Sequence, residues 1–134
     1  MLCHYVASGL IEEMITLRRV YERRSPEDGV SILVDRLWPR GLKKMDADLD
    51  EWMKDIAPSH ELRRRFAHEP ERWKEFRSAY LAELQSPPKA GLVETIARKA
   101  LDTDVTLVYA AKDTERNNAR VLEEAVSQAM ARRR

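Results

Sequence analysis

Two groups of charged and amide residues occur in the sequence, each just beyond the end of an apolar run. They follow the runs VSILV and VTLVY and comprise Asp35-Arg36 with Arg40, and Lys112-Asp113 with Asn117. Guanidinium groups bind phosphate and carboxylate through a planar pair of N–H donors, and a positioned carboxylate can act as a general base. These residue types therefore indicate a site for a small anionic ligand that is nucleotide-like or bears phosphate.

We expect the following roles: an anion clamp from Arg36 and Arg40, a general base from Asp35 or Asp113, and orientation of the substrate by Lys112 and Asn117. Trp38 could stack on a flat ring of the ligand or pack in the core. A purely structural interpretation stays open beside this one. In it, Asp35 forms a salt bridge with Arg63 or Arg64, and Asp113 only caps a helix.

The two apolar runs predict the strands that would position these residues. Residues 30–34 and 105–109 are rich in β-branched side chains and nearly free of polar ones, which is typical of strands buried on both faces of a parallel sheet. Residues 14–21 alternate between apolar and polar and predict a further strand, the first of the three in the chain, and residues 25–29 (SPEDG) predict a turn. Ligands of open α/β sheets bind beyond the carboxyl ends of the strands. Both polar groups are expected there.

The remaining chain shows helical spacing of its apolar residues. The predicted stripes are Leu49, Trp52, Met53 and Ile56; Leu62 and Phe66 after a Ser59 cap; Trp73, Phe76, Tyr80 and Leu84 after Pro70; Leu92, Ile96, Ala97 and Leu101; and Leu122, Ala125, Val126, Ala129 and Met130. The last helix would be capped by Asp113 or Thr114. The sequence thus predicts an α/β fold: a small, mainly parallel sheet flanked by helices, with a long, right-handed helical crossover between the second and third strands.

Length and composition predict one cytoplasmic domain. The chain has 134 residues, of which 43% are hydrophobic and 35% charged, and no apolar run approaches the ~18 residues of a membrane span. The N-terminus lacks the features of a secretory signal. Residues 1–13 show neither strand nor helix pattern, so we expect a disordered leader at 1–13 and a single domain at 14–134.

Several common chemistries have no counterpart in the sequence. The four glycines are Gly9, Gly29, Gly41 and Gly91, too widely spaced for a phosphate-binding loop, so no nucleotide cofactor is expected. The single cysteine and three histidines show no metal-ligand spacing and no catalytic pairing in the folded part. With no cofactor, metal or cysteine–histidine pairing expected, both an enzyme and an enzyme-derived binding domain remain open.

The same segments carry a family resemblance. The matching stretches are VDRLWPRG at 34–41, WMKDIAPS at 52–59, FAHEP at 66–70 and TLVYAAKD at 106–113, followed by Asn117. They resemble the domain-of-unknown-function 488 family in its YeaO-like branch, which implies a small α/β protein without an assigned activity. A wider branch of the family has a Cys-His-Arg element after the late strand. Here that element reads Arg116-Asn117-Asn118, without a cysteine nucleophile or a histidine base.

Two hypotheses from other classes remain. One is a non-catalytic module whose surface combines Arg63-Arg64-Arg65 with Trp73 and Tyr80 to contact a protein or nucleic acid. The spacing of the two aromatic residues favours core positions for both, and a net charge of +1 disfavours nucleic acid as a partner. The other hypothesis is a homodimer with a regulatory role, which nothing in the sequence tests.

Overall fold

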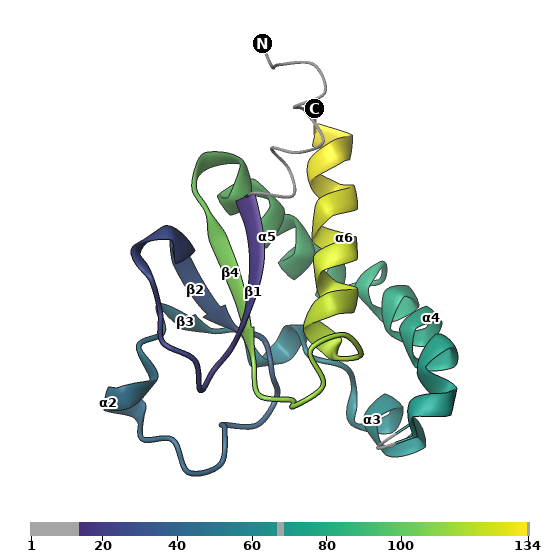
Figure 1. The fold of residues 1–134 in the computed structure, drawn as a ribbon. Helices are drawn as coiled ribbons and strands as arrows, with labels where there is room; N and C mark the ends of the chain where they lie inside the picture. Colours follow the sequence, from purple (N-terminus) through teal and green to yellow (C-terminus); the bar gives the residue numbers. More distant parts are fainter. Residues whose placement is uncertain (1–13, 67–68, 134) are drawn as a thin grey trace.

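The computed structural model describes residues 14–66 and 69–133 (Figure 1). The leader predicted at residues 1–13 lies outside the described residues. Among the helices that are described, none is long and apolar enough to cross a membrane.

A four-stranded sheet has the order β1-β4-β2-β3, and each strand runs parallel to its neighbours. The strands are β1 Ile15–Arg19, β2 Val30–Leu33, β3 Glu51–Trp52 and β4 Val105–Tyr109. β4 lies between β1 and β2, and all five of its residues are buried, which explains its apolar sequence. The expected α/β fold with a parallel sheet is confirmed. Because β2 and β4 are parallel neighbours, they end at the same edge of the sheet.

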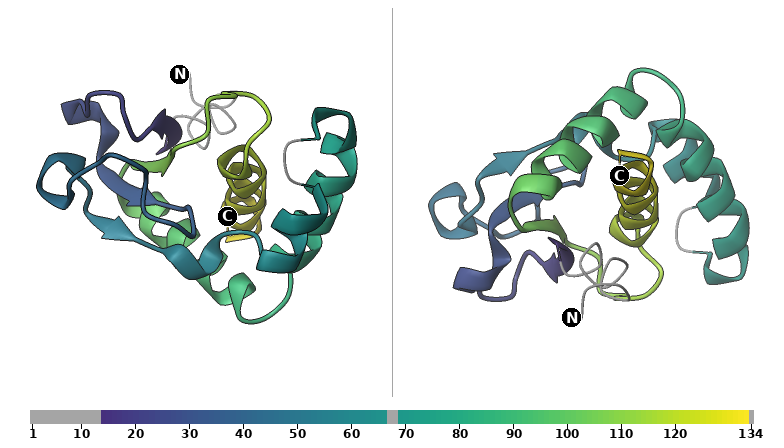
Figure 2. Two further views of the ribbon diagram at one scale, coloured as in Figure 1. Left: turned by 90° about the horizontal axis from the view of Figure 1, so that it is seen from below. Right: turned by 90° about the horizontal axis from the view of Figure 1, so that it is seen from above.

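Eight helical segments complete the described fold. They are the 3₁₀ helices η1 Pro26–Asp28, η2 Lys54–Ile56 and η3 Pro70–Arg72, and the α-helices α2 Lys44–Ala47, α3 His60–Phe66, α4 Trp73–Leu84, α5 Lys89–Asp102 and α6 Asn118–Arg133. α6 contacts β1, β4, α4 and α5, and it lies between the sheet and α4 (Figure 2). The crossover from β2 to β4 contains α2, α3, α4 and α5 and, besides these helices, the short strand β3.

Helices cover one face of the sheet, and a loop covers the other. On the helical face, Leu107 and its neighbours join the main core with side chains of α4, α5 and α6. On the opposite face, Leu33 and Val108 form a smaller buried cluster, which Trp38 and Trp52 cover. The loop that follows β2 therefore has to fold back over the sheet, and this return fixes where its charged residues lie.

The helix predicted over Leu49–Ile56 is wrong. The segment contains β3, which pairs with the edge of β2, and then the single turn η2. Asp50 stabilises this arrangement, because its Oδ2 accepts a hydrogen bond of 2.8 Å from the backbone N–H of Ser31. Pairing with the edge of β2 satisfies backbone groups that an isolated short helix would leave unpaired, and it outweighs the local helical spacing.

Candidate functional site

A pocket of about 950 Å³ opens at the edge of the sheet where β2 and β4 end. Its walls are the loop after β2, the loop between β4 and α6, and residues of α3 and α4. All seven residues predicted from the sequence line it: Asp35, Arg36, Trp38, Arg40, Lys112, Asp113 and Asn117. The parallel order of β2 and β4 is what brings residues so distant in the chain to one place.

Asp35 links the ends of β2 and β4 to the start of α6. Its Oδ2 accepts a hydrogen bond of 2.9 Å from the N–H of Ala110, and its Oδ1 accepts one of 3.1 Å from the side-chain amide of Asn118. Burial raises the pKa of the Asp35 carboxyl above its ordinary value of 3.8, although these hydrogen bonds and the charge of Arg63 oppose the rise. Arg63 acts here through its charge, without the salt bridge that the structural interpretation invoked.

Arg36 is held loosely at the pocket wall. Its guanidinium lies 3.7 Å from Oδ1 of Asp55 and donates a long hydrogen bond of 3.4 Å to the carbonyl of Ala57. Its buried Nε has no hydrogen-bond partner in the part of the chain that the structure describes. Buried polar groups are nearly always paired, so this unpaired Nε and the long hydrogen bond leave Arg36 weakly anchored.

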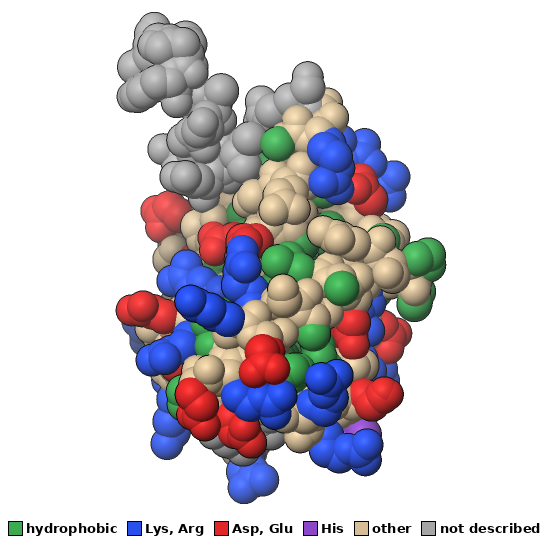
Figure 3. Space-filling model, turned by 90° about the vertical axis from the view of Figure 1, so that its right-hand side faces the viewer, with side chains coloured by type: hydrophobic (Ala, Val, Ile, Leu, Met, Phe, Trp, Pro, Cys, Tyr) green, Lys and Arg blue, Asp and Glu red, His purple; other side chains and the backbone are tan. Residues whose placement is uncertain are grey.

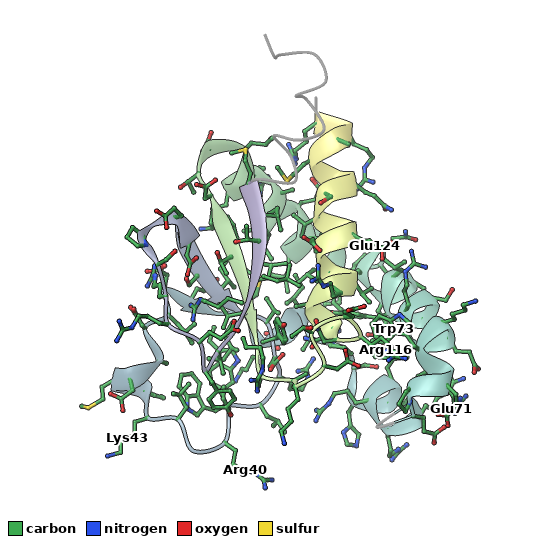
Figure 4. All side chains as sticks on the ribbon, viewed as in Figure 1. Arg40, Lys43, Glu71, Trp73, Arg116 and Glu124 are labelled. Carbon is green, nitrogen blue, oxygen red and sulfur yellow. The ribbon has the colours of Figure 1, made fainter. Side chains whose placement is uncertain are left out.

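Trp38 and Arg40 take different places in the loop after β2. The ring of Trp38 packs edge-on against Trp52 with centroids 5.3 Å apart, and its N–H donates to the carbonyl of Leu42 at 2.6 Å. Trp38 is thus a packing residue whose exposed edge lines the pocket. Arg40 lies at the tip of the loop (Figure 4), where its carbonyl accepts a hydrogen bond of 3.0 Å from the hydroxyl of Tyr21.

The prediction that Asp113 or Thr114 caps the last helix is wrong. Asn117 is the cap, because its Oδ1 accepts a hydrogen bond of 3.0 Å from the N–H of Arg120 in the first turn of α6. Asp113 instead closes the turn before the helix, where its Oδ1 accepts from the N–H groups of Glu115 and Arg116 at 2.9 and 3.0 Å. These bonds lower the pKa of the Asp113 carboxyl, which makes it a weaker base.

The pocket carries an excess of unpaired positive charge. Its lining contains six Lys and Arg residues against three Asp and Glu residues. Each carboxylate has partners: Asp35 the two donors above, Asp113 an ion pair with Arg116 at 3.4 Å, and Glu69 an ion pair with Arg72 at 3.7 Å. Four of the cations make neither a side-chain hydrogen bond nor an ion pair among the described residues: Arg40, Arg63, Arg64 and Lys112.

The surface expected for an interaction module does not form as predicted. Tyr80 is completely buried, and its hydroxyl donates a hydrogen bond of 2.6 Å to the carbonyl of Ile56. On the side of the molecule where α4 lies, acidic and basic side chains are interspersed (Figure 3). A polyanion such as nucleic acid would meet no single-sign surface there.

The α3–α4 wall of the pocket was not assigned to the site from the sequence. It includes Arg63 and Arg64 together with His60, Trp73 and Phe76. In the sequence the cations form a basic run and the aromatic residues form a helical stripe, and neither signal indicates that α3 and α4 approach the strand ends. The packing of α4 against α6 and of α3 against α4 places this wall there.

Comparisons with known proteins agree on one family. A model of the inactive DUF488-N3 subclade matches residues 14–134. The uncharacterized protein YeaO of Escherichia coli is 48% identical over 108 residues, which cover 81% of this chain and 92% of that protein. The uncharacterized protein Rv3073c of Mycobacterium tuberculosis is 40% identical over 111 residues, covering 83% and 92%. No solved structure matches the chain. The chain belongs to the DUF488 family, as a YeaO-like member of the DUF488-N3 subclade that is described as inactive.

Proposed function

We propose that the protein binds a small ligand bearing phosphate or carboxylate in the pocket at the ends of β2 and β4, and that it does not catalyse a reaction on this ligand. The observation that carries the proposal is the set of four pocket cations that make no side-chain hydrogen bond and no ion pair within the described part of the chain. Charged side chains confined to a concave wall raise the local positive potential and concentrate anions. The first turn of α6 adds the positive end of a helix dipole beside Asn117 and Asn118, both of which line the pocket.

Binding without catalysis is favoured because both candidate bases are already engaged. Asp35 accepts hydrogen bonds on each of its carboxylate oxygens. Asp113 closes a turn with one oxygen and pairs with Arg116 through the other. A general base must release its own contacts to move a proton freely, and each of these carboxylates holds a loop in place through both of its oxygens. The description of the matching subclade as inactive supports the same conclusion.

Removing the unpaired cations tests the proposal. Calorimetric titration with ribose 5-phosphate should show binding to the native protein. Arg40→Ala, Arg64→Ala and Lys112→Ala should each raise the dissociation constant by about fivefold, the effect of about 1 kcal/mol expected for an exposed charge that contacts an anion. The triple variant should bind weakly or not at all, and binding to the native protein should weaken as salt is added.

Lys43→Ala is the matched control for this titration. Lys43 is an exposed cation in the same loop as Arg40 but does not line the pocket (Figure 4). Its replacement changes the net charge equally and should leave the dissociation constant unchanged. An equal loss in Lys43→Ala and Arg40→Ala would show that only the overall charge matters, which contradicts a pocket site. Hydrolysis of a phosphate ester by the native protein, lost in Asp35→Asn, would contradict the non-catalytic part.

A further inference from the structure

We infer that the ligand carries a planar aromatic ring besides its anionic group, as a nucleoside monophosphate does, and that Trp73 binds this ring. The inference rests on the proposed function and narrows the class of ligand for the same pocket. It begins from a difference between the pocket walls. The two loops contribute charged groups, whereas α4 contributes the aromatic side chains Trp73 and Phe76.

Trp73 is the outer member of a row of aromatic rings. Its ring centroid lies 5.5 Å from that of Phe76 at 30°, and Phe76 lies 5.8 Å from Tyr80 at 37°. Tyr80 is buried and hydrogen-bonded, so the inner end of the row is fixed in the core. Trp73 is only half-buried, and its indole N–H makes no hydrogen bond among the described residues. A ring in this position is held in place while part of its surface still faces the pocket.

Trp38 is less suited to hold a ligand ring, although it lines the same pocket. Its N–H is bound to the carbonyl of Leu42, and its ring covers the small buried cluster at Leu33 and Val108 together with Trp52. Turning Trp38 toward a ligand would break this hydrogen bond and expose the cluster. Trp73 can contact a ring without losing a hydrogen bond.

The anionic and aromatic parts of the pocket fit one ligand of moderate size. The volume of about 950 Å³ is far more than a lone phosphate would fill and lies within the range typical of sites for small organic ligands. Arg116 and Trp73 belong to different walls of this one pocket. Stacking on a half-buried indole contributes about 1 to 3 kcal/mol per base in proteins that bind single-stranded nucleic acid. Of the row, Trp73 and Phe76 line the pocket and Tyr80 does not; this short aromatic surface suits a single base.

The test compares two phosphates that differ by a base. AMP and ribose 5-phosphate are titrated calorimetrically into the native protein and into Trp73→Leu and Trp73→Phe. AMP should bind the native protein about tenfold more tightly than ribose 5-phosphate does, equivalent to about 1.4 kcal/mol. Trp73→Leu should remove this difference and leave the affinity for ribose 5-phosphate unchanged, while Trp73→Phe should keep most of the difference. Thermal unfolding followed by circular dichroism checks that each variant is folded.

The possible outcomes separate this inference from the proposed function. Equal affinities of the native protein for AMP and ribose 5-phosphate would overturn the inference and leave the proposed function standing. An equal loss of affinity for both ligands in Trp73→Leu would also overturn the inference alone, since Trp73 would then only support the pocket. Failure of both phosphates to bind would overturn the proposed function and the inference with it. Tighter binding of a short single-stranded oligonucleotide than of AMP would also overturn it, in favour of a polymer.

Discussion

Replacing Gly29 by alanine should lower the free energy of unfolding by about 3 kcal/mol or more, the largest effect that we expect from a single substitution. Gly29 has φ of 64° and ψ of −131°, a conformation that costs other residues about 1 to 3 kcal/mol. A Cβ atom there would lie 2.1 Å from the carbonyl oxygen of Asp104. That oxygen accepts a hydrogen bond of 2.9 Å from the N–H of Val30, so it cannot move without disturbing the contact between β2 and the start of β4.

Gly91→Ala is the matched control. Gly91 lies in α5, is exposed, and has no atom within 4 Å of the position that a Cβ would take. Alanine is the better helix former, so this substitution should raise the free energy of unfolding by about 0.5 to 1 kcal/mol. Urea denaturation of both variants measures the two changes. Effects of the same sign, or a loss below about 1 kcal/mol in Gly29→Ala, would contradict the packing described at Asp104.

Replacing Asp35 by leucine should lower the free energy of unfolding by about 3 kcal/mol. The change leaves the N–H of Ala110 and the side-chain amide of Asn118 without the acceptors they now have, and each partly buried donor left unpaired costs about 1 to 3 kcal/mol. Asp35→Asn retains one carbonyl acceptor and should cost only about 1 kcal/mol. Urea denaturation at neutral pH distinguishes these values. A loss as small in Asp35→Leu as in Asp35→Asn would contradict the linking role of Asp35.

The stability of the native protein relative to Asp35→Asn should also depend on pH. Burial raises the pKa of Asp35 in the folded state above its ordinary value of 3.8, so the folded state binds the proton more tightly than the unfolded state. The resulting contribution to stability is complete below the ordinary pKa and is lost as the pH rises through the folded pKa. The stability of the native protein minus that of Asp35→Asn should therefore fall as the pH rises above 3.8 and through the folded pKa of Asp35. A rise over this interval would contradict the stated direction of the shift.

The sequence predicts most of the fold because its signals are local. β4 and the equivalent run in β2 are recognisable from consecutive β-branched residues, and α4 and α6 from apolar residues on one helical face. The parallel arrangement of the strands then predicts that Asp35 and Lys112 line one site, since their strands must end at the same edge. The shared pocket agrees with this positional reasoning; its use for a ligand is still a prediction.

The features that the sequence does not predict depend on contacts between residues that are far apart in the chain. β3 is only two residues long. It forms because it pairs with the edge of β2, a contact that its own sequence does not reveal. The cap of α6 could not be chosen from Asp113 and Asn117 by residue type, because each can accept a backbone N–H; the length of the intervening turn decides between them. The place of Trp73 in its helical stripe predicts a core residue. It is half-exposed because it lies at the end of α4 that borders the pocket.

The most direct test of the central claim is to map, by NMR, the backbone amides that respond when ribose 5-phosphate is added to the native protein. Binding in the pocket predicts shifts that saturate together in three segments, at 35–41, 60–64 and 110–118, with little change near Gly29 and Asp104 at the opposite end of the strands. Saturating shifts confined to another part of the molecule, or no saturation at any amide, would contradict an anion site at the ends of β2 and β4.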